Sequence, residues 1–337
     1  TAGCTGSVTR LAQALETPRQ AAGRLELTLN DTPVARLASF AAPHGVRPAA
    51  GRLEARLLLT ADGSGEVTFE TTAAAERLQL QLPDEDHPSM PPARVGLALQ
   101  GAWRQGRLQV HEAALSSPWL AATAAADLLA QAGIGTHPDD TAQLSLRMEL
   151  APLRRDWGRL LGINPELTVD DGRLTTDLAL GHDHTGLWVT TEIRSTNLQF
   201  RIGQQALRPS PPPSLSVRAR RDAAGVWELL RGELTASFAR LSSSGTATAG
   251  AVQGSLDLTR LAGDLKPIVP ALPRMVGQIS VAASTRLPHD APRGAVAAEL
   301  VFREVAVEGG GDRPWVLEAG RLTADAELLR PASGRWP

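Results

Sequence analysis

The chain of 337 residues contains one cysteine, one lysine and no tyrosine. Because Cys4 has no partner cysteine, an intramolecular disulfide is impossible, which excludes a small disulfide-stapled secreted domain. We interpret Cys4 as a small residue of a β-strand. No apolar run approaches the ~18–20 residues of a membrane-spanning helix, and no signal peptide is visible. The strand pattern is already under way at Thr1 and still running at Pro337, so we expect a segment of a longer protein.

Aromatic residues and charge of one sign are also scarce. Phenylalanine, tryptophan and tyrosine together make up 4% of the chain, and the formal net charge is −2. Binding to nucleic acid favours a basic stripe interleaved with aromatic side chains. Here the arginines are scattered and form no block of like charge. We therefore expect no nucleic-acid partner.

What the chain has in abundance is apolar residues that alternate with polar ones. Apolar residues make up 42% of the sequence, which is ample for a packed core. After Gly172, for example, Leu174, Leu178 and Leu180 all fall on one side of a strand. A period of two with one apolar side is typical of an antiparallel sheet that is covered on one face. The sequence therefore predicts a mainly β protein.

Three stretches repeat the same element, and they begin at Gly51, Gly172 and Gly277. The first two align along their whole length with a one-residue gap, as GRLEARLLLTADGSGEVTFETTAAAERLQL and GRLTTDLALGHDHTGLWVTTEIRSTNLQF. Self-similarity of this kind is the signature of a repeat architecture. We predict units of four or five strands with one short intervening helix each. The predicted parts are 1–50 (a partial repeat, helix near 31–42), 51–171 (helix near 151–163), 172–276 (helix near 258–270) and 277–337 (a partial, shortened repeat).

Turn residues and tryptophans punctuate these copies. Glycine-rich residues 62–65 predict the tip of the first hairpin, and residues 182–186 occupy the same place in the second. Trp103, Trp227 and Trp315 each precede a glycine that we place at the start of a strand. We interpret the three tryptophans as equivalent packing anchors at strand ends.

The sharpest cluster of possible metal ligands is His182-Asp183-His184. The repeat alignment places it on the tip of a hairpin, and no third ligand can be assigned. We therefore interpret it as a solvated turn and predict no metal site. The acidic residues 84–87 lack the spacing of a calcium loop and precede a proline-rich turn, so we interpret them as a solvated loop.

No catalytic motif is present in the sequence. A nucleophile elbow, a phosphate-binding loop and a Cys-x-x-Cys pair are all missing. Asp139-Asp140 and Asp170-Asp171 are interpreted as turns and caps. An enzyme would need His111 or His184 to lie beside Asp170. We expect no enzyme activity, no catalytic residue and no cofactor.

Together, the alternating Gly-x-Leu strands, the short Leu-Thr-Arg-Leu helix and the Trp-Gly-x-Leu element resemble the repeat region of AsmA-like and TamB-like proteins. The clearest instance is Gly254-Ser-Leu-Asp-Leu-Thr-Arg-Leu261, which is followed by Gly277-Gln-Ile. This family is similar to the bridge-like lipid transfer proteins, and the resemblance covers nearly the whole chain. It implies an elongated, curved antiparallel sheet with an apolar concave groove.

The resemblance also implies a location and a role. Such proteins are tethered to the inner membrane of a Gram-negative-type envelope by a segment that this chain does not contain, and they extend into the periplasm. They are involved in phospholipid transport to the outer membrane or in its assembly. The implied partners are phospholipid acyl chains, the inner and outer membranes through regions outside this chain, and envelope proteins.

For a lipid-conducting groove, the predicted lining consists of apolar residues from the alternating strands: Leu53, Leu57, Leu59, Leu80, Leu97, Leu174, Leu178, Leu180, Leu198, Phe200 and Val217. The alternative is a structural or interaction module of β-repeats, with a dry core and no lipid ligand. The two differ in whether the apolar face is covered by protein.

Overall fold

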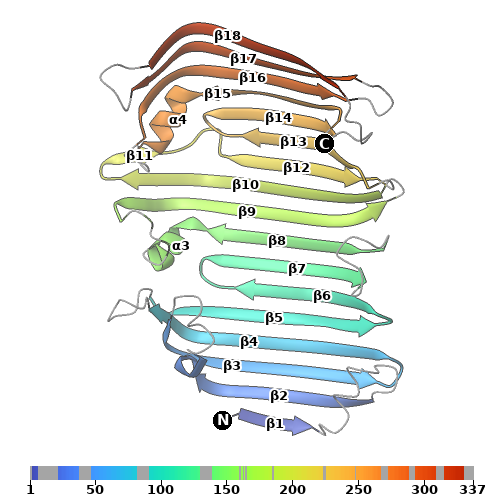
Figure 1. Ribbon diagram of the computed structural model, residues 1–337. Coiled ribbons are helices and arrows are strands. Elements are labelled where there is room, and N and C mark those ends of the chain that lie inside the picture. The colour runs from blue at the N-terminus through green and yellow to red at the C-terminus, as the bar shows by residue number, and fades with distance from the viewer. Residues whose placement is uncertain are drawn as a thin grey trace. The chain divides into compact units, whose positions relative to one another are not determined.

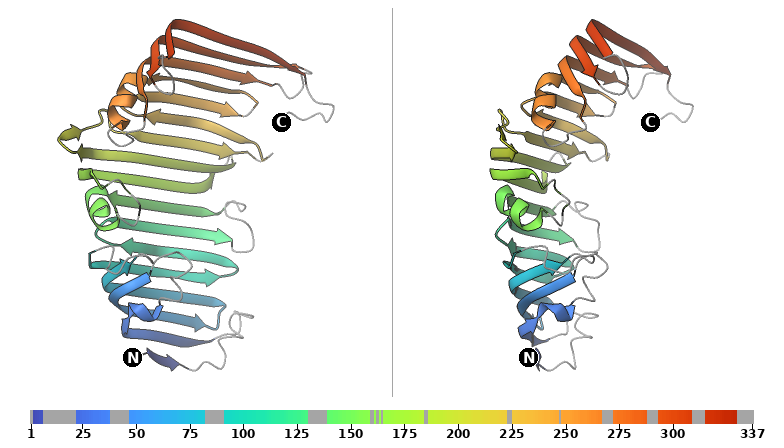
Figure 2. Two further views of the ribbon diagram at one scale, coloured as in Figure 1. Left: turned by 60° about the vertical axis from the view of Figure 1, so that its left-hand side comes forward. Right: turned by 90° about the vertical axis from the view of Figure 1, so that its left-hand side faces the viewer.

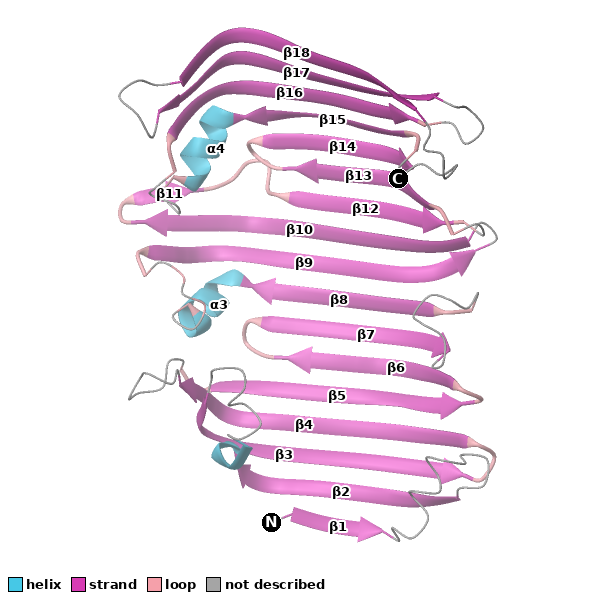
Figure 3. Ribbon diagram, viewed as in Figure 1, coloured by secondary structure: helices cyan, strands magenta, loops and turns pink. Residues whose placement is uncertain are grey.

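The computed structural model describes residues 2–6, 22–37, 47–81, 91–129, 139–158, 161, 163, 165–183, 186–222, 225–246, 248–266, 272–287, 293–308 and 315–329 (Figure 1). The chain divides into two compact units, Thr1–His182 and Asp183–Pro337. We call them unit 1 and unit 2, in chain order. Described residues are overwhelmingly in strands, which confirms the mainly β prediction (Figure 3).

Unit 1 is an antiparallel meander in which every described strand from β1 to β9 pairs with the next. Its elements are β1 (Ala2–Gly6), β2 (Ala22–Pro33), η3 (Val34–Leu37), β3 (Arg47–Asp62), β4 (Glu66–Gln81), β5 (Ala93–Arg104), β6 (Arg107–Ser116), β7 (Leu120–Leu129), β8 (Thr141–Glu149), α3 (Leu150–Trp157) and β9 (Leu167–Asp183). Cys4 lies in β1, as expected.

Unit 2 repeats the antiparallel arrangement, and β16 to β18 bend along their length (Figure 1). Its elements are β10 (Gly186–Ile202), β11 (Gln205–Leu207), β12 (Ser214–Arg221), β13 (Trp227–Thr235), β14 (Ala239–Thr246), β15 (Gly250–Asp257), α4 (Leu258–Leu265), β16 (Arg274–Arg286), β17 (Arg293–Glu308) and β18 (Trp315–Leu329). Figure 2 shows each unit from the side as one layer of strands with short helices beside it.

Short helices lie where the repeat pattern predicted them. η3, α3 and α4 fall inside the predicted ranges 31–42, 151–163 and 258–270, apart from one residue at the start of α3. Among the described residues, six strands (β3 to β8) lie between the first repeat glycine and α3, where the pattern had indicated four or five. The strand beyond the expected number is β7, in the alanine-rich stretch 120–129, where alternation is weak. Its counterpart in unit 2 is β14, in the serine-rich stretch 239–246.

Each repeat contains a residue with positive φ that the sequence did not reveal. Arg77, Asn197 and Glu304 have φ of 52°, 55° and 51°, and each lies near the end of the second strand of its copy. In every copy apolar residues follow at the first and third positions: Leu78 and Leu80, Leu198 and Phe200, Val305 and Val307.

This left-handed residue keeps leucines on one face. In β4, Ala75 lies opposite Val95 and Leu78 lies opposite Ala93, with a register shift between them. Val95 and Ala93 are two apart on β5, so they face the same side. Residues three apart on β4 therefore share a face, because the bulge at Arg77 shifts the alternation by one.

The strand ends near each helix also repeat in the backbone. The Glu149 N–H donates to the carbonyl oxygen of Trp119 at 3.0 Å, and the Asp257 N–H donates to that of Phe238 at 2.7 Å. Both bonds join the last residue before a helix to the turn between the two preceding central strands. This correspondence fixes Trp119 as the counterpart of Phe238.

The predicted equivalence of Trp103, Trp227 and Trp315 is only partly right. Trp103 lies in β5, before a turn at Gln105-Gly106, whereas Trp227 and Trp315 each begin a strand that contains the following glycine. The Trp-Gly spacing therefore marks a hairpin in the first copy and a single strand in the other two. Similar letters at similar spacing fell on different parts of the unit.

Candidate functional site

The pairing register gives unit 1 one continuous apolar face. Residues directly opposite each other in an antiparallel sheet point to the same side. One such row crosses the sheet from β2 to β9 and contains a single polar residue, Thr71. The row consists of Leu27, Leu57, Thr71, Leu99, Ala113, Ala124, Leu144 and Leu178.

Most predicted lining residues of unit 1 lie on this face. Leu53, Leu57 and Leu59 alternate along β3 and share its side. Leu97 lies opposite Ala73, and Ala73 lies opposite Ala55, so Leu97 joins them. Leu174, Leu178 and Leu180 reach the same face through Met148, Leu144 and Ala142. Leu80 joins through the bulge at Arg77.

In unit 2 the register places Val217 on a row of mostly small and apolar residues. Val217 lies opposite Thr191 and Gly232, and the row continues through Ser243, Val252, Ala283 and Ala298 to Ala324. Leu198 and Phe200 lie further along β10, beyond Arg194, where its pairing with β12 ends. Phe200 lies opposite Leu207 of β11. The register therefore does not join these two residues to the Val217 row.

Large side chains on the unit 1 face are not covered by the described parts of the chain. Leu27, Leu97 and Leu144 are 37%, 44% and 38% exposed, although each sits within a strand. Leu57 and Leu178 are half-buried. A dry core would bury side chains at these positions below about one-tenth. The face is therefore an exposed apolar surface.

The corresponding face of unit 2 carries smaller side chains. Across β13 to β15 its rows contain Gly232, Ser243, Gly245 and Gly254 where unit 1 has alanine and leucine. Val252, in the middle of β15, is 42% exposed. Less apolar area is available here per strand.

The opposite face of unit 1 is polar and joined by ion pairs. Arg56 Nε lies 2.9 Å from Glu26 Oε1, and its hydrogen bond lowers the pKa of the Glu26 carboxyl. Arg173 Nε lies 2.8 Å from Glu149 Oε1. Desolvation raises the pKa of Glu149, but the hydrogen bonds from Arg147 and Arg173 lower it overall. The two faces of the sheet thus differ sharply in polarity.

Unit 2 contains a hollow of about 740 Å³ over β13 to β18. Its lining comes mainly from the polar face, with residues such as Arg231, Glu233, Gln253, Glu299 and Asp325. A neighbouring hollow of about 640 Å³ shares Glu233 and Gln253 with it. The curvature of this part of the sheet therefore forms a polar concavity, which the alternation pattern alone did not predict.

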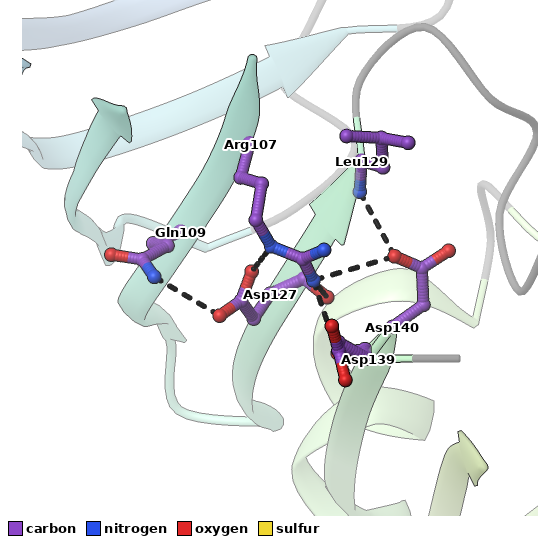
Figure 4. Close-up of polar contacts among 6 residues, drawn as sticks. All are labelled: Arg107, Gln109, Asp127, Leu129, Asp139 and Asp140. Atoms are coloured by element: carbon purple, nitrogen blue, oxygen red, sulfur yellow. Dashed lines mark hydrogen bonds and ion pairs between the residues drawn. The ribbon is translucent and has the colours of Figure 1, made fainter. Parts of the chain in front are cut away.

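The most connected polar cluster joins β6, β7 and the start of β8 (Figure 4). Arg107 donates from Nε to Asp127 Oδ1 at 2.7 Å and from Nη2 to the Asp139 carbonyl oxygen at 3.0 Å. The hydrogen bond that Arg107 donates to Asp127 raises the pKa of Arg107. Asp140 Oδ1 accepts from the Leu129 N–H at 2.9 Å. These contacts pin the beginning of β8 to the end of β7.

Asp140 corrects the expectation of a solvated turn. Its side chain is fully buried, whereas Asp139 is exposed, as predicted for a turn. The buried carboxylate is satisfied by a backbone N–H and lies 3.5 Å from Arg107 Nη2. The cluster is best explained as a structural clamp, since Arg107, Asp127 and Asp140 satisfy one another and nearby backbone groups.

Predicted chemical candidates do not assemble into a catalytic or metal site in the described part of the chain. No group of three or more possible metal ligands is found there. His182 lies at the end of β9, and residues 184 and 84–87 lie outside the described residues. His111 in β6 and Asp170 in β9 are three strands apart, which is ~14 Å across the sheet.

No described helix is long and apolar enough to cross a membrane. No protein-family model matches the chain, and neither a curated protein nor a solved structure does. The structure therefore defines the class: an open antiparallel meander with one apolar and one polar face in each unit.

Proposed function

We propose that the chain is a non-enzymatic segment that binds lipid acyl chains on its apolar sheet face and conducts them along it. The observation that supports this most is the apolar face of unit 1, where Leu27, Leu97 and Leu144 remain exposed although each lies within a strand. An acyl chain needs apolar area and no converging polar groups. The face offers that chemistry.

The size of the face fits the energetics. Burying a methylene contributes ~0.8 kcal/mol, so ten methylenes contribute about 8 kcal/mol. Association costs about 4–15 kcal/mol in lost motion and ordering. Only a ligand with long chains overcomes this cost, and it needs a long apolar track. Eight strands from β2 to β9, at ~4.8 Å spacing, provide a track of about 34 Å.

The cellular setting is part of the same proposal. We place the chain in the periplasm of a Gram-negative-type envelope, tethered to the inner membrane by a segment outside this chain. Its role there is phospholipid transport to the outer membrane, or assembly of that membrane. This placement rests on the resemblance to AsmA-like and TamB-like proteins.

A second candidate is an interaction module without a lipid ligand. The polar hollow of unit 2 favours it, because side chains of a partner protein could fill its volume of about 740 Å³ without any lipid. In that case the exposed leucines of unit 1 would be covered by a partner. The two candidates differ in what co-purifies with the protein.

Native mass spectrometry of the purified chain, followed by lipid extraction, tests the proposal. Leu144 and Gln143 are neighbours on β8 that face opposite sides. We expect Leu144→Glu to reduce bound phospholipid severalfold and Gln143→Glu to leave it unchanged. Both variants add one negative charge to the same strand, so circular dichroism should show equal folding.

Two outcomes would contradict the proposal. Absence of phospholipid from the wild-type chain, even after incubation with phospholipid vesicles, would favour the interaction module. Equal lipid loss in Leu144→Glu and Gln143→Glu would show that the apolar face is not the binding surface.

A further inference from the structure

A bulge in β13 places two arginines opposite each other on the polar face of unit 2. Arg218 of β12 lies directly opposite Arg231 of β13. The next pair along these strands is Ala219 with Leu229, which leaves Leu230 as the extra residue of the bulge. Regular alternation would turn Leu229 and Arg231 to the same side, whereas the bulge turns Arg231 to the other. Arg231 accordingly lines the polar hollow of this unit.

The two arginines form an unfavourable pair within the sheet. Like charges directly across two antiparallel strands are destabilising. Arg231 Nη2 donates to Glu233 Oε2 at 2.7 Å, but its other guanidinium N–H groups make no hydrogen bond to the described residues. Arg218 is exposed and makes no side-chain hydrogen bond or ion pair within the described part of the chain. No described carboxylate therefore neutralises the charge of Arg218.

Neighbouring carboxylates on this face already have cationic partners. Glu228 Oε2 accepts from Arg220 Nη2 at 2.5 Å, and Glu192 accepts from Arg194. Their charges are offset locally, as is that of Glu233. Proteins break local rules of this kind mainly at functional or strained sites, and bulges beside such sites re-aim side chains. An anion from outside the chain would balance the excess positive charge.

Hydroxyl groups extend the arginine pair into a row of four polar side chains. Thr190 of β10 lies opposite Arg218, and Ser244 of β14 lies opposite the bulge that contains Arg231. The four neighbouring strands span ~14 Å across the sheet. Neither hydroxyl makes a side-chain hydrogen bond to the described residues. Guanidinium and hydroxyl donors suit the oxygen atoms of a phosphate group, which arginine binds through two parallel hydrogen bonds.

The polar hollow lies beside the arginine pair. Its lining next to Arg231 includes Ser242, Ser244 and Gln253. Ser242 and Gln253 line the neighbouring hollow as well. Hydroxyl and amide side chains both donate and accept hydrogen bonds, so they suit a polar, uncharged molecule. The lining is therefore compatible with the hydroxylated body of a ligand whose phosphate lies at the arginines.

We propose that Arg218 and Arg231 bind the phosphate group of a small polyhydroxylated ester, whose body lies in the hollow. A volume of about 740 Å³ is large enough for a hexose phosphate. The surface is concave, so a soluble molecule reaches it more readily than a headgroup in a flat bilayer. The site lies on the polar face, opposite the surface proposed for acyl chains. The two proposals therefore fail separately.

Phosphorus NMR line broadening of glucose 6-phosphate by the purified full chain tests the site. We expect broadening that decreases as salt is added, because the contacts are between exposed charges. Arg218→Gln should weaken binding about fivefold, and the double variant Arg218→Gln/Arg231→Gln should abolish it. Arg303→Gln is the matched control. Arg303 is exposed, faces the same side as Glu299 and lines neither hollow, so loss of its charge should leave binding unchanged.

Thermal unfolding gives a second readout, which a folding defect would not imitate. Glucose 6-phosphate should raise the unfolding midpoint of the wild type more than glucose and sodium chloride at the same concentrations, because it binds only the folded state. The double variant should show no such difference. Without ligand, Arg218→Gln should be at least as stable as the wild type, since it removes one of two like charges.

Four results would overturn the proposal. The wild type could cause no broadening, or Arg303→Gln could lose as much binding as Arg218→Gln, and either result would exclude a specific site. Inorganic phosphate that binds as tightly as glucose 6-phosphate would remove the hollow from the site. Vesicles containing phosphatidylglycerol that bind the wild type but not Arg218→Gln, without any binding of glucose 6-phosphate, would assign the arginines to a membrane headgroup instead.

Discussion

Units 1 and 2 hold their helices against equivalent turns with different chemistry. In unit 1, Trp157 of α3 meets Trp119 of the β6–β7 turn edge to face, with ring centroids 5.1 Å apart and planes at 83°. In unit 2, Ser237 of the β13–β14 turn donates from its hydroxyl to Asp264 of α4. Arg260 of α4 also donates to the Ser237 carbonyl oxygen at 3.3 Å.

The connections between the last two strands before each helix differ as well. In unit 1 the buried Asp140 clamps the start of β8 to the end of β7. In unit 2 a tight turn joins β14 to β15, and the Thr246 N–H donates to the Ala249 carbonyl oxygen at 3.1 Å. The repeated backbone bonds to Trp119 and Phe238 are the same in both. The two units thus share the backbone bonds of the repeat, while different side chains stabilise it in each unit.

The largest expected effect is on the aromatic contact. Trp119 is 8% exposed, so Trp119→Ala should cost about 3–5 kcal/mol in the free energy of unfolding. Urea unfolding followed by far-UV circular dichroism measures it. Phe238→Ala, at the equivalent but half-buried position, should cost about 2 kcal/mol or less. Equal losses would show that the two turns are packed alike and would remove the contrast between the units.

Next comes the glycine at the start of the third copy. Gly277 has φ of +104°, and an added Cβ would lie 2.5 Å from the carbonyl oxygen of Glu304. Gly277→Ala should cost about 3 kcal/mol, because both strain and a backbone clash oppose it. Gly51→Ala meets a looser contact, 3.0 Å from Leu78 Cα, and should cost less.

Gly263 in α4 is the matched control for the same substitution. Nothing lies within 4 Å of the position that a Cβ would occupy there, and its φ is not positive. Gly263→Ala should stabilise the protein by about 0.5–1 kcal/mol, since alanine is the better helix former. A loss at Gly263 similar to that at Gly277 would refute the argument from backbone conformation.

A smaller effect is expected at the unit 1 clamp. Asp140→Ala leaves the Leu129 N–H without its acceptor, which should cost about 2 kcal/mol. Asp140→Asn retains the side-chain oxygen and should cost less. Thr246→Ala, in the tight turn of unit 2, keeps the main-chain bond and should cost under about 1 kcal/mol. Chemical unfolding of the three variants in parallel gives the ranking, and an unchanged stability of Asp140→Ala would remove the clamp from the comparison.

The smallest effect concerns helix capping. Asp257 caps α4 by accepting from the Arg260 N–H at 2.9 Å, whereas Glu149 makes no side-chain cap for α3. Asp257→Ala should therefore cost about 1 kcal/mol. Asp257→Asn keeps an acceptor at the same place and should cost little. Thermal unfolding of both variants checks this, and equal losses would point to the charge of Asp257 instead of the cap.

The alternation pattern predicted some strands well and others poorly. Alternation identified β3 and β9 and the face of their leucines, because those strands are regular and one side is apolar. It was weak over β7 and β14, since alanine and serine do not distinguish the two sides of a strand. It matched Trp103 with Trp227, which occupy different parts of the unit, and it missed Phe238 as the counterpart of Trp119, which the equivalent backbone bonds reveal.

At the candidate site, too, some residues could be predicted from the sequence and others could not. Leu53, Leu57 and Leu178 were identified correctly as sharing a face, because side-chain direction in a regular strand follows from residue parity alone. The burial of Asp140 and the polar hollow of unit 2 were not predicted, because both depend on strands that are distant in sequence. A single aspartate beside another gives no signal of which one a neighbouring strand will cover.

By itself, the sequence determined the antiparallel β architecture, the positions of the short helices and the existence of an apolar face. These are local properties, because the alternation of a strand and the propensity to form a short helix both depend on residues within one element. Only the tertiary structure decided the register that aligns those faces into one row and the bulge at Arg77 that keeps Leu78 and Leu80 on it. Each of these arises from pairing between strands, where backbone hydrogen bonds and sheet curvature join residues that no local pattern relates.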